Sequence, residues 1–507
     1  MNYRDSVLAG SSDTSLPPDP DEAPTHGPGL PGPVARAARL ARTWWRSGRP
    51  EHGFMLNDRQ LIAWYAVFTG YGVAVIIFSG GGADRVWGLW AAGGYALTIA
   101  TAMLAARFGR FALPLLTSLA FALAAPMIWL ALRAPATADV SVVSRSASLL
   151  LRTGSPYLPA GQLATWRAYN PYLPAMAAFG LPRALDLPGL LGDPRPWLAV
   201  ATVVLLAAAF WMAAPHRIMR CRSCGWAAAW CAAFLVASPV LAFPLAVGIT
   251  DPPVIALMCF ALACVARSPR LPVVAGMAIG IACAMKATAW PALAVITAML
   301  VARDGAREAA RFVGACVITA AGLVAATAPV LLAEPAALLQ NTVLYPLGMT
   351  LHKTPAASPL PGHLLAATGP AGHLAAIGLL ITAGLGVAAS LVLRPPATVS
   401  AATMRLSIGL ALMFVLAPAT RFGYFAYPAA LLGWSAVIRP DRLCPDRDPA
   451  APAEPAPAPA AVDQVPPAHD RSDMLLRASR YLLPQHSPAP HRIRRWRRKA
   501  DQNPMTP

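Results

Sequence analysis

The chain has 507 residues, of which 56% are hydrophobic and 13% charged, and its mean hydropathy is +0.51. This composition excludes an ordinary soluble domain and is typical of a multi-spanning membrane protein. Much of the net charge of +18 lies in the tails and in short links between apolar runs. That placement favours membrane lipids over nucleic acid as the partner of the positive charge.

Two tails flank the apolar part of the chain. Residues 1–58 are polar and rich in Pro and Gly, without a cleavable signal peptide, and residues 441–507 carry an Ala/Pro tract followed by R-I-R-R-W-R-R-K-A. We expect both tails to be disordered and cytoplasmic. The region between them, 59–440, is the predicted transmembrane domain.

The apolar runs predict an all-α bundle of about 12 spans in the plasma membrane. Basic residues occur in seven segments that a twelve-span threading places on one side, which the positive-inside rule makes cytoplasmic. Both termini are therefore expected inside. The predicted spans are 61–79, 86–106, 112–132, 197–214, 227–247, 252–266, 271–285, 288–302, 311–333, 372–393, 405–419 and 421–438.

Two predicted hairpins consist of apolar runs that are each short for crossing a bilayer, because the hydrocarbon core needs about 20 helical residues. They are 271–302, with Lys286 at its tip, and 405–438, with Arg421 near its tip. Short helices that turn below the outer surface are tolerated where they line a hydrated cavity, and cations there are functional candidates. The alternative is that each cation snorkels to the outer headgroups.

A first large segment, 133–196, is predicted on the outer face because its Pro, Arg and Asp content prevents it from spanning. Within it, 140–152 predicts an interfacial amphipathic helix, because its apolar residues lie at helical spacing: Val140, Val143, Ala147, Leu150 and Leu151. Asp139 stands directly before this helix. It is either the helix N-cap or a catalytic carboxylate, and the two roles are compatible.

Two further outer features follow. The Pro-rich segment 334–371 predicts an ordered loop or partial lid and contains Lys353. The turn G-I-T-D-P-P at 248–253 places Asp251 between two spans, either as a turn residue or as a group that orients a sugar hydroxyl.

Metal chemistry is not expected. Cys221 and Cys224 form a single C-x-x-C without a second pair, and the histidines of the second outer segment lack the spacing of a helical metal pair. The D-x-D pattern occurs only in the tails, which argues against a metal-dependent transferase that uses nucleotide sugars. We predict no metal and no cofactor.

Three stretches together resemble one enzyme family. The first runs from Asp139 to Y-N-P-Y-L-P at 169–174, the second joins 248–253 to A-C-A-M-K-A-T-A-W-P, and the third is A-P-A-T-R-F-G-Y-F-A-Y-P. They are similar to glycosyltransferase family 87, actinobacterial membrane mannosyltransferases of the GT-C superclass. The resemblance covers roughly 135–438. Unlike the usual family member, this chain places two additional spans before its first outer loop.

The resemblance implies an inverting transferase that moves a hexose, mannose in the family, from a polyprenyl-phosphate donor to a lipid or glycan acceptor outside the membrane. Asp139 stands where the family has its base. The candidates for binding the donor or acceptor are four cations, one carboxylate and three aromatic residues: Lys286, Arg421, Arg145, Lys353, Asp251, Tyr157, Tyr169 and Tyr172.

Three alternatives stay open from the sequence. The tyrosines, with Trp166, form either a stacking wall for sugar rings or an interfacial aromatic belt. A transporter or flippase of lipid-linked sugars would use the same cations without a base, although no convincing internal repeat supports it. A non-enzymatic membrane scaffold would use only the basic tails.

Overall fold

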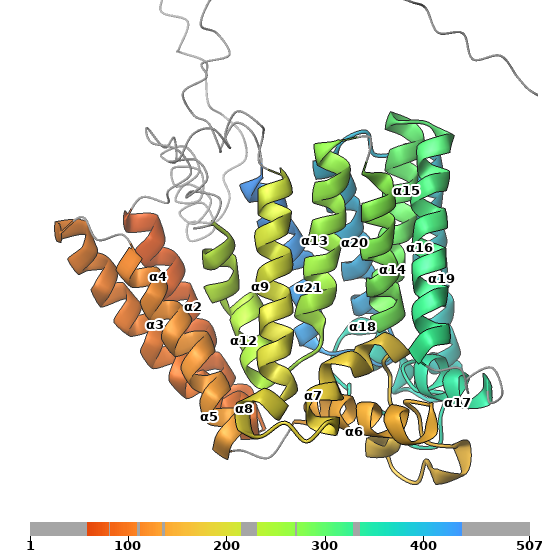
Figure 1. The fold of residues 1–507 in the computed structure, drawn as a ribbon, viewed down its shortest axis with the longest axis horizontal. Coiled ribbons are helices and arrows are strands. Elements are labelled where there is room, and N and C mark those ends of the chain that lie inside the picture. Colours follow the sequence, from red (N-terminus) through yellow and green to blue (C-terminus); the bar gives the residue numbers. More distant parts are fainter. Residues whose placement is uncertain are drawn as a thin grey trace, which may run out of the picture. The chain divides into compact units, whose positions relative to one another are not determined.

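The computed structural model describes most of the span between the two tails (Figure 1). The predicted disordered tails lie outside the described residues, as do Cys221 and Cys224. The described residues are 58–80, 82–108, 112–133, 137–213, 231–268, 271–327 and 335–438.

The regular secondary structure of the described residues is helical, apart from one isolated β-bridge between Ala357 and Thr420. The all-α prediction is therefore confirmed. Six helices are long and apolar enough to cross a membrane, and α14 and the segment Ala287–Arg303 are shorter apolar helices. This is a multi-pass membrane protein, while the number of twelve spans stays a prediction.

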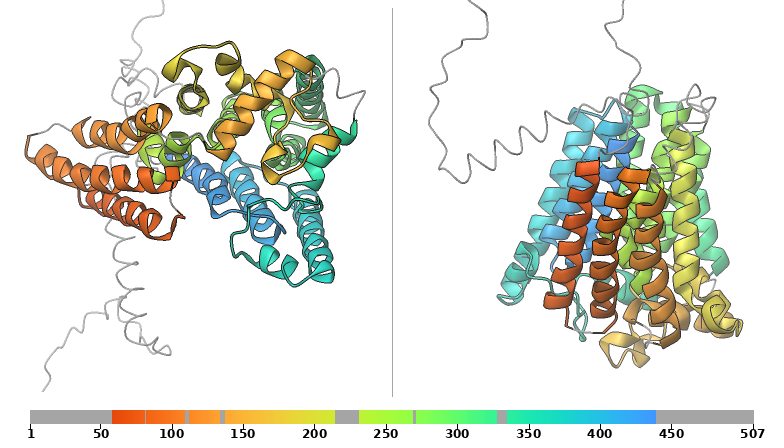
Figure 2. Two further views of the ribbon diagram at one scale, coloured as in Figure 1. Left: turned by 90° about the horizontal axis from the view of Figure 1, so that it is seen from below. Right: turned by 90° about the vertical axis from the view of Figure 1, so that its left-hand side faces the viewer.

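The first helices pack side by side and join α12 (Figures 1 and 2). A π-helical turn, η1, interrupts the predicted span 112–132, and the Trp87 indole donates to the Ala122 carbonyl within it at 2.8 Å. A buried Trp N–H usually needs such a partner. The elements are α2 (Asp58–Phe78), α3 (Gly82–Phe108), α4 (Ala112–Ser118), η1 (Leu119–Ala124) and α5 (Ala125–Arg133).

Short elements gather at one end of these helices and of the later ones, here called the α6 end (Figure 1). Seen from that end, α6 lies across the bundle (Figure 2). The predicted helix 140–152 is thus confirmed. The elements are α6 (Ala138–Thr153), η2 (Ala160–Gln162), η3 (Trp166–Ala168), η4 (Pro174–Gly180), α7 (Leu181–Ala184), α8 (Gly189–Gly192), α17 (Pro335–Leu339), η7 (Gln340–Leu344) and α18 (Pro361–Ala366).

The core-facing side of α6 differs from the predicted one. Leu151 was expected on it but is exposed, whereas Ser146 and Leu149 are buried. Burial of Ser146 is tolerated because its hydroxyl donates to the Val142 carbonyl at 2.6 Å and accepts from the Asn170 side chain at 2.9 Å.

The remaining helices run between the α6 end and the opposite end, where the α15–α16 connection lies (Figure 1). Prolines in the first turns of α13, α14 and α19 suit the start of a helix, where a missing N–H costs little. The elements are α9 (Pro194–Ala213), α12 (Pro239–Val247), α13 (Asp251–Arg267), α14 (Pro272–Met285), η5 (Ala287–Ala289), α15 (Trp290–Arg303), α16 (Ala306–Thr327), α19 (Pro370–Leu393), α20 (Val399–Leu416), η8 (Phe422–Phe425) and α21 (Ala426–Val437).

The two short hairpins have the break that the sequence predicted. Lys286 lies between α14 and η5 in an extended conformation, and Arg421 lies likewise between α20 and η8. Helix α13 is the most enclosed element, with almost every residue buried. The fold therefore delivers Asp251, Lys286 and Arg421 to helix ends around a central buried helix.

Candidate active site

Asp251 and Lys286 form a buried ion pair at the start of α13. The Lys286 ammonium contacts Asp251 Oδ1, and both residues are buried: Lys286 is 9% exposed and Asp251 is 2% exposed. The Tyr427 hydroxyl donates to the same oxygen at 2.8 Å and lies 2.7 Å from the Thr288 hydroxyl. We call these four residues the Asp251 network. Because its charges are already neutralised, its carboxylate is a poor candidate for a proton acceptor.

Two aromatic rings complete the surroundings of Lys286. Its ammonium lies 5.3 Å from the centroid of the Tyr172 ring and 5.4 Å from that of Tyr424. Both distances allow a cation–π interaction. Tyr172, a predicted binding residue, thus lies against Lys286 and near Asp251.

Asn170 explains why Tyr172 lies there. Its side chain accepts from the Tyr172 N–H at 3.1 Å and donates to Ser146 of α6, while its own backbone N–H donates to Asn341 at 2.7 Å. The Y-N-P-Y segment is therefore fastened at once to α6 and to η7. The motif is visible in the sequence, but the role of Asn170 in holding it through three hydrogen bonds is not.

Asp139 is the second residue of α6, not its N-cap. Thr137 is the cap, and its hydroxyl accepts from the Val140 N–H at 3.4 Å. Of the two roles left open for Asp139, the N-cap is therefore wrong, since Thr137 two residues earlier supplies the oxygen. The Asp139 side chain is free of that duty and is half-buried.

The Asp139 carboxylate faces groups from several elements. It interacts with the Tyr172 hydroxyl and electrostatically with Arg421 and Lys286. Burial first, and then the Asp139 charge, raise the pKa of Tyr172 well above its usual value. Within the described ranges no cation lies at ion-pair distance from Asp139. This carboxylate is near positive charge without being neutralised by a direct contact.

Arg421 is held by its neighbours on the chain. The Thr420 N–H donates to Ala356 at 2.9 Å, the Ser358 N–H to Thr420 at 3.0 Å, and the Phe422 N–H to the Ser358 hydroxyl at 3.1 Å. The guanidinium is half-buried and interacts electrostatically with Asp139. Among described groups it makes no hydrogen bond or ion pair, so its five donors are available to a ligand.

Two other predicted site residues, Arg145 and Tyr157, hold the outer segment together. The Arg145 guanidinium donates to the carbonyls of Arg167, Ala168 and Tyr169 at 2.6–3.2 Å, and burial lowers its pKa. The buried Tyr157 hydroxyl donates to the Tyr172 carbonyl at 2.8 Å.

Tyr169 stacks on Tyr345 with ring centroids 4.4 Å apart. Tyr157, Tyr169 and Tyr172 are each less than 5% exposed, so they form neither an exposed belt nor an open wall. Lys353, by contrast, is exposed and makes no hydrogen bond or ion pair with another described residue.

Asp84 was missed by the sequence analysis. It lies in the first turn of α3, one of the helices that precede the first outer segment, and interacts electrostatically with Arg421 and Asp139. Tyr427 was missed too, because its hydroxyl shows its role only through a partner 176 residues away. No group of three or more His, Cys, Asp or Glu that could hold a metal occurs in the described ranges. The absence of a metal or cofactor requirement stays a prediction.

Comparison with known proteins gives one match. Residues 169–418 match the model of Glycosyltransferase family 87. No curated protein and no solved structure matches the chain. The matched segment contains the whole Asp251 network except Tyr427, whereas Asp139 lies 30 residues before its start and Arg421 three residues after its end.

Proposed function

Because the chain belongs to glycosyltransferase family 87, a family of membrane glycosyltransferases, we propose that it moves a hexose, mannose by resemblance, from a polyprenyl-phosphate sugar to a lipid or glycan acceptor. The observation that carries this proposal is the electrostatic interaction of Asp139 with Arg421 at the α6 end of the bundle, each without an ion-pair partner among described residues. The α6 end is the outer face in this proposal, with both tails cytoplasmic.

An apolar cavity supports a donor with a hydrocarbon chain. The cavity has a volume of about 740 Å³ and lies between α14, α15 and α16. Cys283 and Ala284 line it just before Lys286, so the apolar cavity ends beside the charged residues. A polyprenyl phosphate has the matching arrangement of apolar chain and anionic head. The lining residues are Leu173, Cys283, Ala284, Trp290, Leu293, Cys316, Val317, Ala320, Ala321, Val324, Ala325, Pro335 and Leu338.

Arg421 is the first candidate for the donor phosphate. An arginine holds a phosphate through parallel charge-assisted hydrogen bonds, and its donors are not used by described groups. Lys286 is already engaged by Asp251 and adds positive potential nearby. Preorganised positive charge is most effective where negative charge develops, here on the leaving phosphate.

Asp139 is the candidate base. The acceptor oxygen attacks the anomeric carbon from the face opposite the phosphate, and its proton passes to the Asp139 carboxylate. The bond between the anomeric carbon and the phosphate oxygen breaks, and its electron pair leaves with the phosphate. A single displacement of this kind inverts the anomeric centre.

The test is sugar transfer in membranes from a labelled polyprenyl-phosphate hexose. Wild type is expected to form a labelled acceptor from this donor and not from a nucleotide hexose. Movement of the lipid-linked sugar across the membrane without transfer would support the flippase instead. Use of the nucleotide donor would overturn the proposed donor class.

A further inference from the structure

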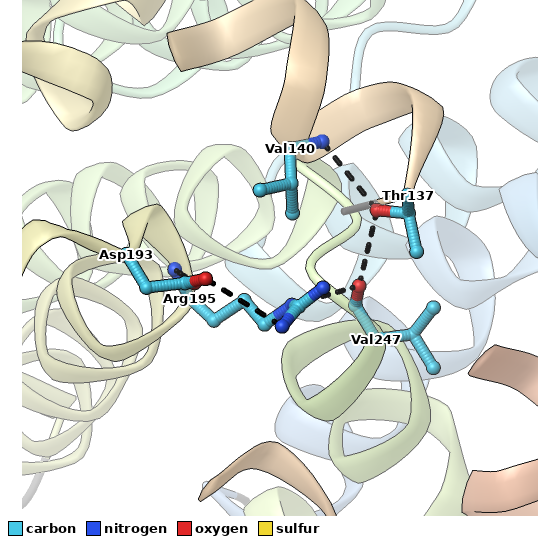
Figure 3. A network of polar contacts seen from close by, with 5 residues as sticks. All are labelled: Thr137, Val140, Asp193, Arg195 and Val247. Carbon is cyan, nitrogen blue, oxygen red and sulfur yellow. Dashed lines mark hydrogen bonds and ion pairs between the residues drawn. The ribbon is translucent and has the colours of Figure 1, made fainter. Parts of the chain in front are cut away.

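The Val247 carbonyl is a junction between three elements. It accepts from the Thr137 hydroxyl at 3.3 Å and from Arg195 Nε at 3.4 Å (Figure 3). Thr137 is the N-cap of α6, Arg195 is the second residue of α9, and Val247 ends α12. One backbone oxygen therefore ties the start of α6 to the turn that leads into α13.

The junction is rigid because the next residue leaves no space. Gly248 has φ +91°, and a Cβ there would lie 2.4 Å from Val140 Cγ2 and 2.9 Å from Arg195 Cγ. Glycine adopts this left-handed conformation without strain and permits the close approach. The turn is consequently pressed against both α6 and Arg195.

Arg195 is an unusual residue to find in this place. It is 1% exposed, its N–H bonds Asp193 at 2.9 Å and its Nη1 lies 3.5 Å from the second Asp193 oxygen. Its Nη2 is buried without a described hydrogen-bond partner. Burying a guanidinium with an unused donor is costly, so stability alone does not account for it.

The junction lies a few residues from both carboxylates. Asp139 follows Thr137 by two residues, and Asp251 follows Val247 by four. We infer that Arg195 is a positioning residue for Asp139. Through the Val247 carbonyl and Thr137 it fixes where α6 begins relative to α13, and so where the base stands relative to Arg421 and the Asp251 network. This inference rests on the proposed function, because it concerns the same transfer step.

The kinetic test compares Arg195→Met with Arg152→Met. Arg152 is an exposed arginine in the last turn of α6, the helix that carries Asp139, and serves as the matched control. Arg195→Met is expected to lower kcat about 10- to 100-fold, since small displacements of a catalytic group cost up to about two orders of magnitude. The KM for the donor is expected to stay within about twofold, and Arg152→Met to behave as wild type.

A second pair of variants approaches the junction from α6. Thr137→Val removes the hydroxyl and is expected to reproduce the loss in kcat, whereas Thr137→Ser keeps the hydroxyl and retains activity. In an Asp139→Asn background, Arg195→Met is expected to cause no additional loss. If the two losses multiply instead, Arg195 does not act through Asp139 and the inference is overturned.

Hydrogen exchange separates this inference from the proposed function. In the purified full-length protein, Arg195→Met is expected to speed amide exchange in residues 138–142, and Arg152→Met is not. Unchanged exchange in Arg195→Met would overturn the inference whatever the donor. If Arg195→Met speeds exchange but the wild type transfers no sugar from the polyprenyl donor, the role of the junction stands and the proposed function is overturned.

Discussion

The two carboxylates near the α6 end have opposite surroundings. Asp251 is 2% exposed and shares one oxygen between Lys286 and Tyr427, whereas Asp139 is half-buried and has no ion-pair partner among described residues. The two cations differ in the same way, because Lys286 has an ion-pair partner and Arg421 has none within the described ranges. Paired charges hold a structure together, while charges left available in a half-buried site are the ones a substrate can use.

The comparison is tested most severely at Asp139. Asp139→Asn preserves the shape of the side chain but cannot accept a proton, so we expect transfer to fall by about 10²- to 10⁴-fold. Donor binding and thermal stability should stay near wild type, since Thr137 rather than Asp139 caps α6. Sugar transfer and donor titration in membranes measure both. An active Asp139→Asn variant would remove the distinction between the two carboxylates.

A substitution at Lys286 tests the buried ion pair with Asp251. Lys286→Met leaves Asp251 buried without its cation, which typically costs about 3–5 kcal/mol. We expect a large loss of folded protein after mild heating in detergent. The double variant Lys286→Met with Asp251→Asn removes both charges and is expected to recover most of that loss. If the double variant is as unstable as the single one, the pair is not what holds α13 to α14.

Arg421 tests the unpaired cation. Arg421→Ala should raise the donor concentration needed for half-maximal transfer by about 10- to 100-fold, the equivalent of a charge-assisted contact of about 1.5–3 kcal/mol. Arg421→Lys should be intermediate, because it keeps the charge but not the bidentate geometry. Arg152→Ala is the control from an exposed arginine with no proposed role in binding. Equal saturation curves for all of them would show that Arg421 does not bind the phosphate.

The smallest effect is expected at Tyr169. Its stack on Tyr345 predicts that Tyr169→Leu costs about 0.5–1.5 kcal/mol of stability beyond the lost burial, with Tyr169→Phe close to wild type. Thermal unfolding measures the change in stability, and acceptor titration measures whether the KM for the acceptor changes as well. A large rise in acceptor KM with unchanged stability would restore the stacking wall as its role.

Positions of charged residues relative to apolar runs were readable from the sequence. Asp139, Lys286 and Arg421 are polar residues where such runs begin or end, and the structure has each at a helix boundary. Their partners were not readable. Tyr427 and Asn341 look like ordinary residues of an apolar helix and a loop, and their bonds span 176 and 171 residues.

Boundaries failed where tertiary contacts override local preference. The predicted span 421–438 begins five residues too early, because the backbone at Thr420 pairs with Ala356 and the helix starts only at Ala426. The cap of α6 was misplaced because Thr137 and Asp139 are both good capping residues, and the Val247 carbonyl selects Thr137.

The shortness of α14 determines the depth at which the reaction would occur. Its 14 residues rise about 21 Å at 1.5 Å each, well short of a hydrocarbon core of about 30 Å. If α14 begins at the opposite headgroup plane, Lys286 and its neighbours stand several ångströms below the headgroup plane at the α6 end. At an effective dielectric constant of about 20 instead of 80, unit charges 4 Å apart attract with about 4 rather than 1 kcal/mol. A recessed arginine therefore attracts a phosphate more strongly, and salt in the surrounding water screens that attraction less.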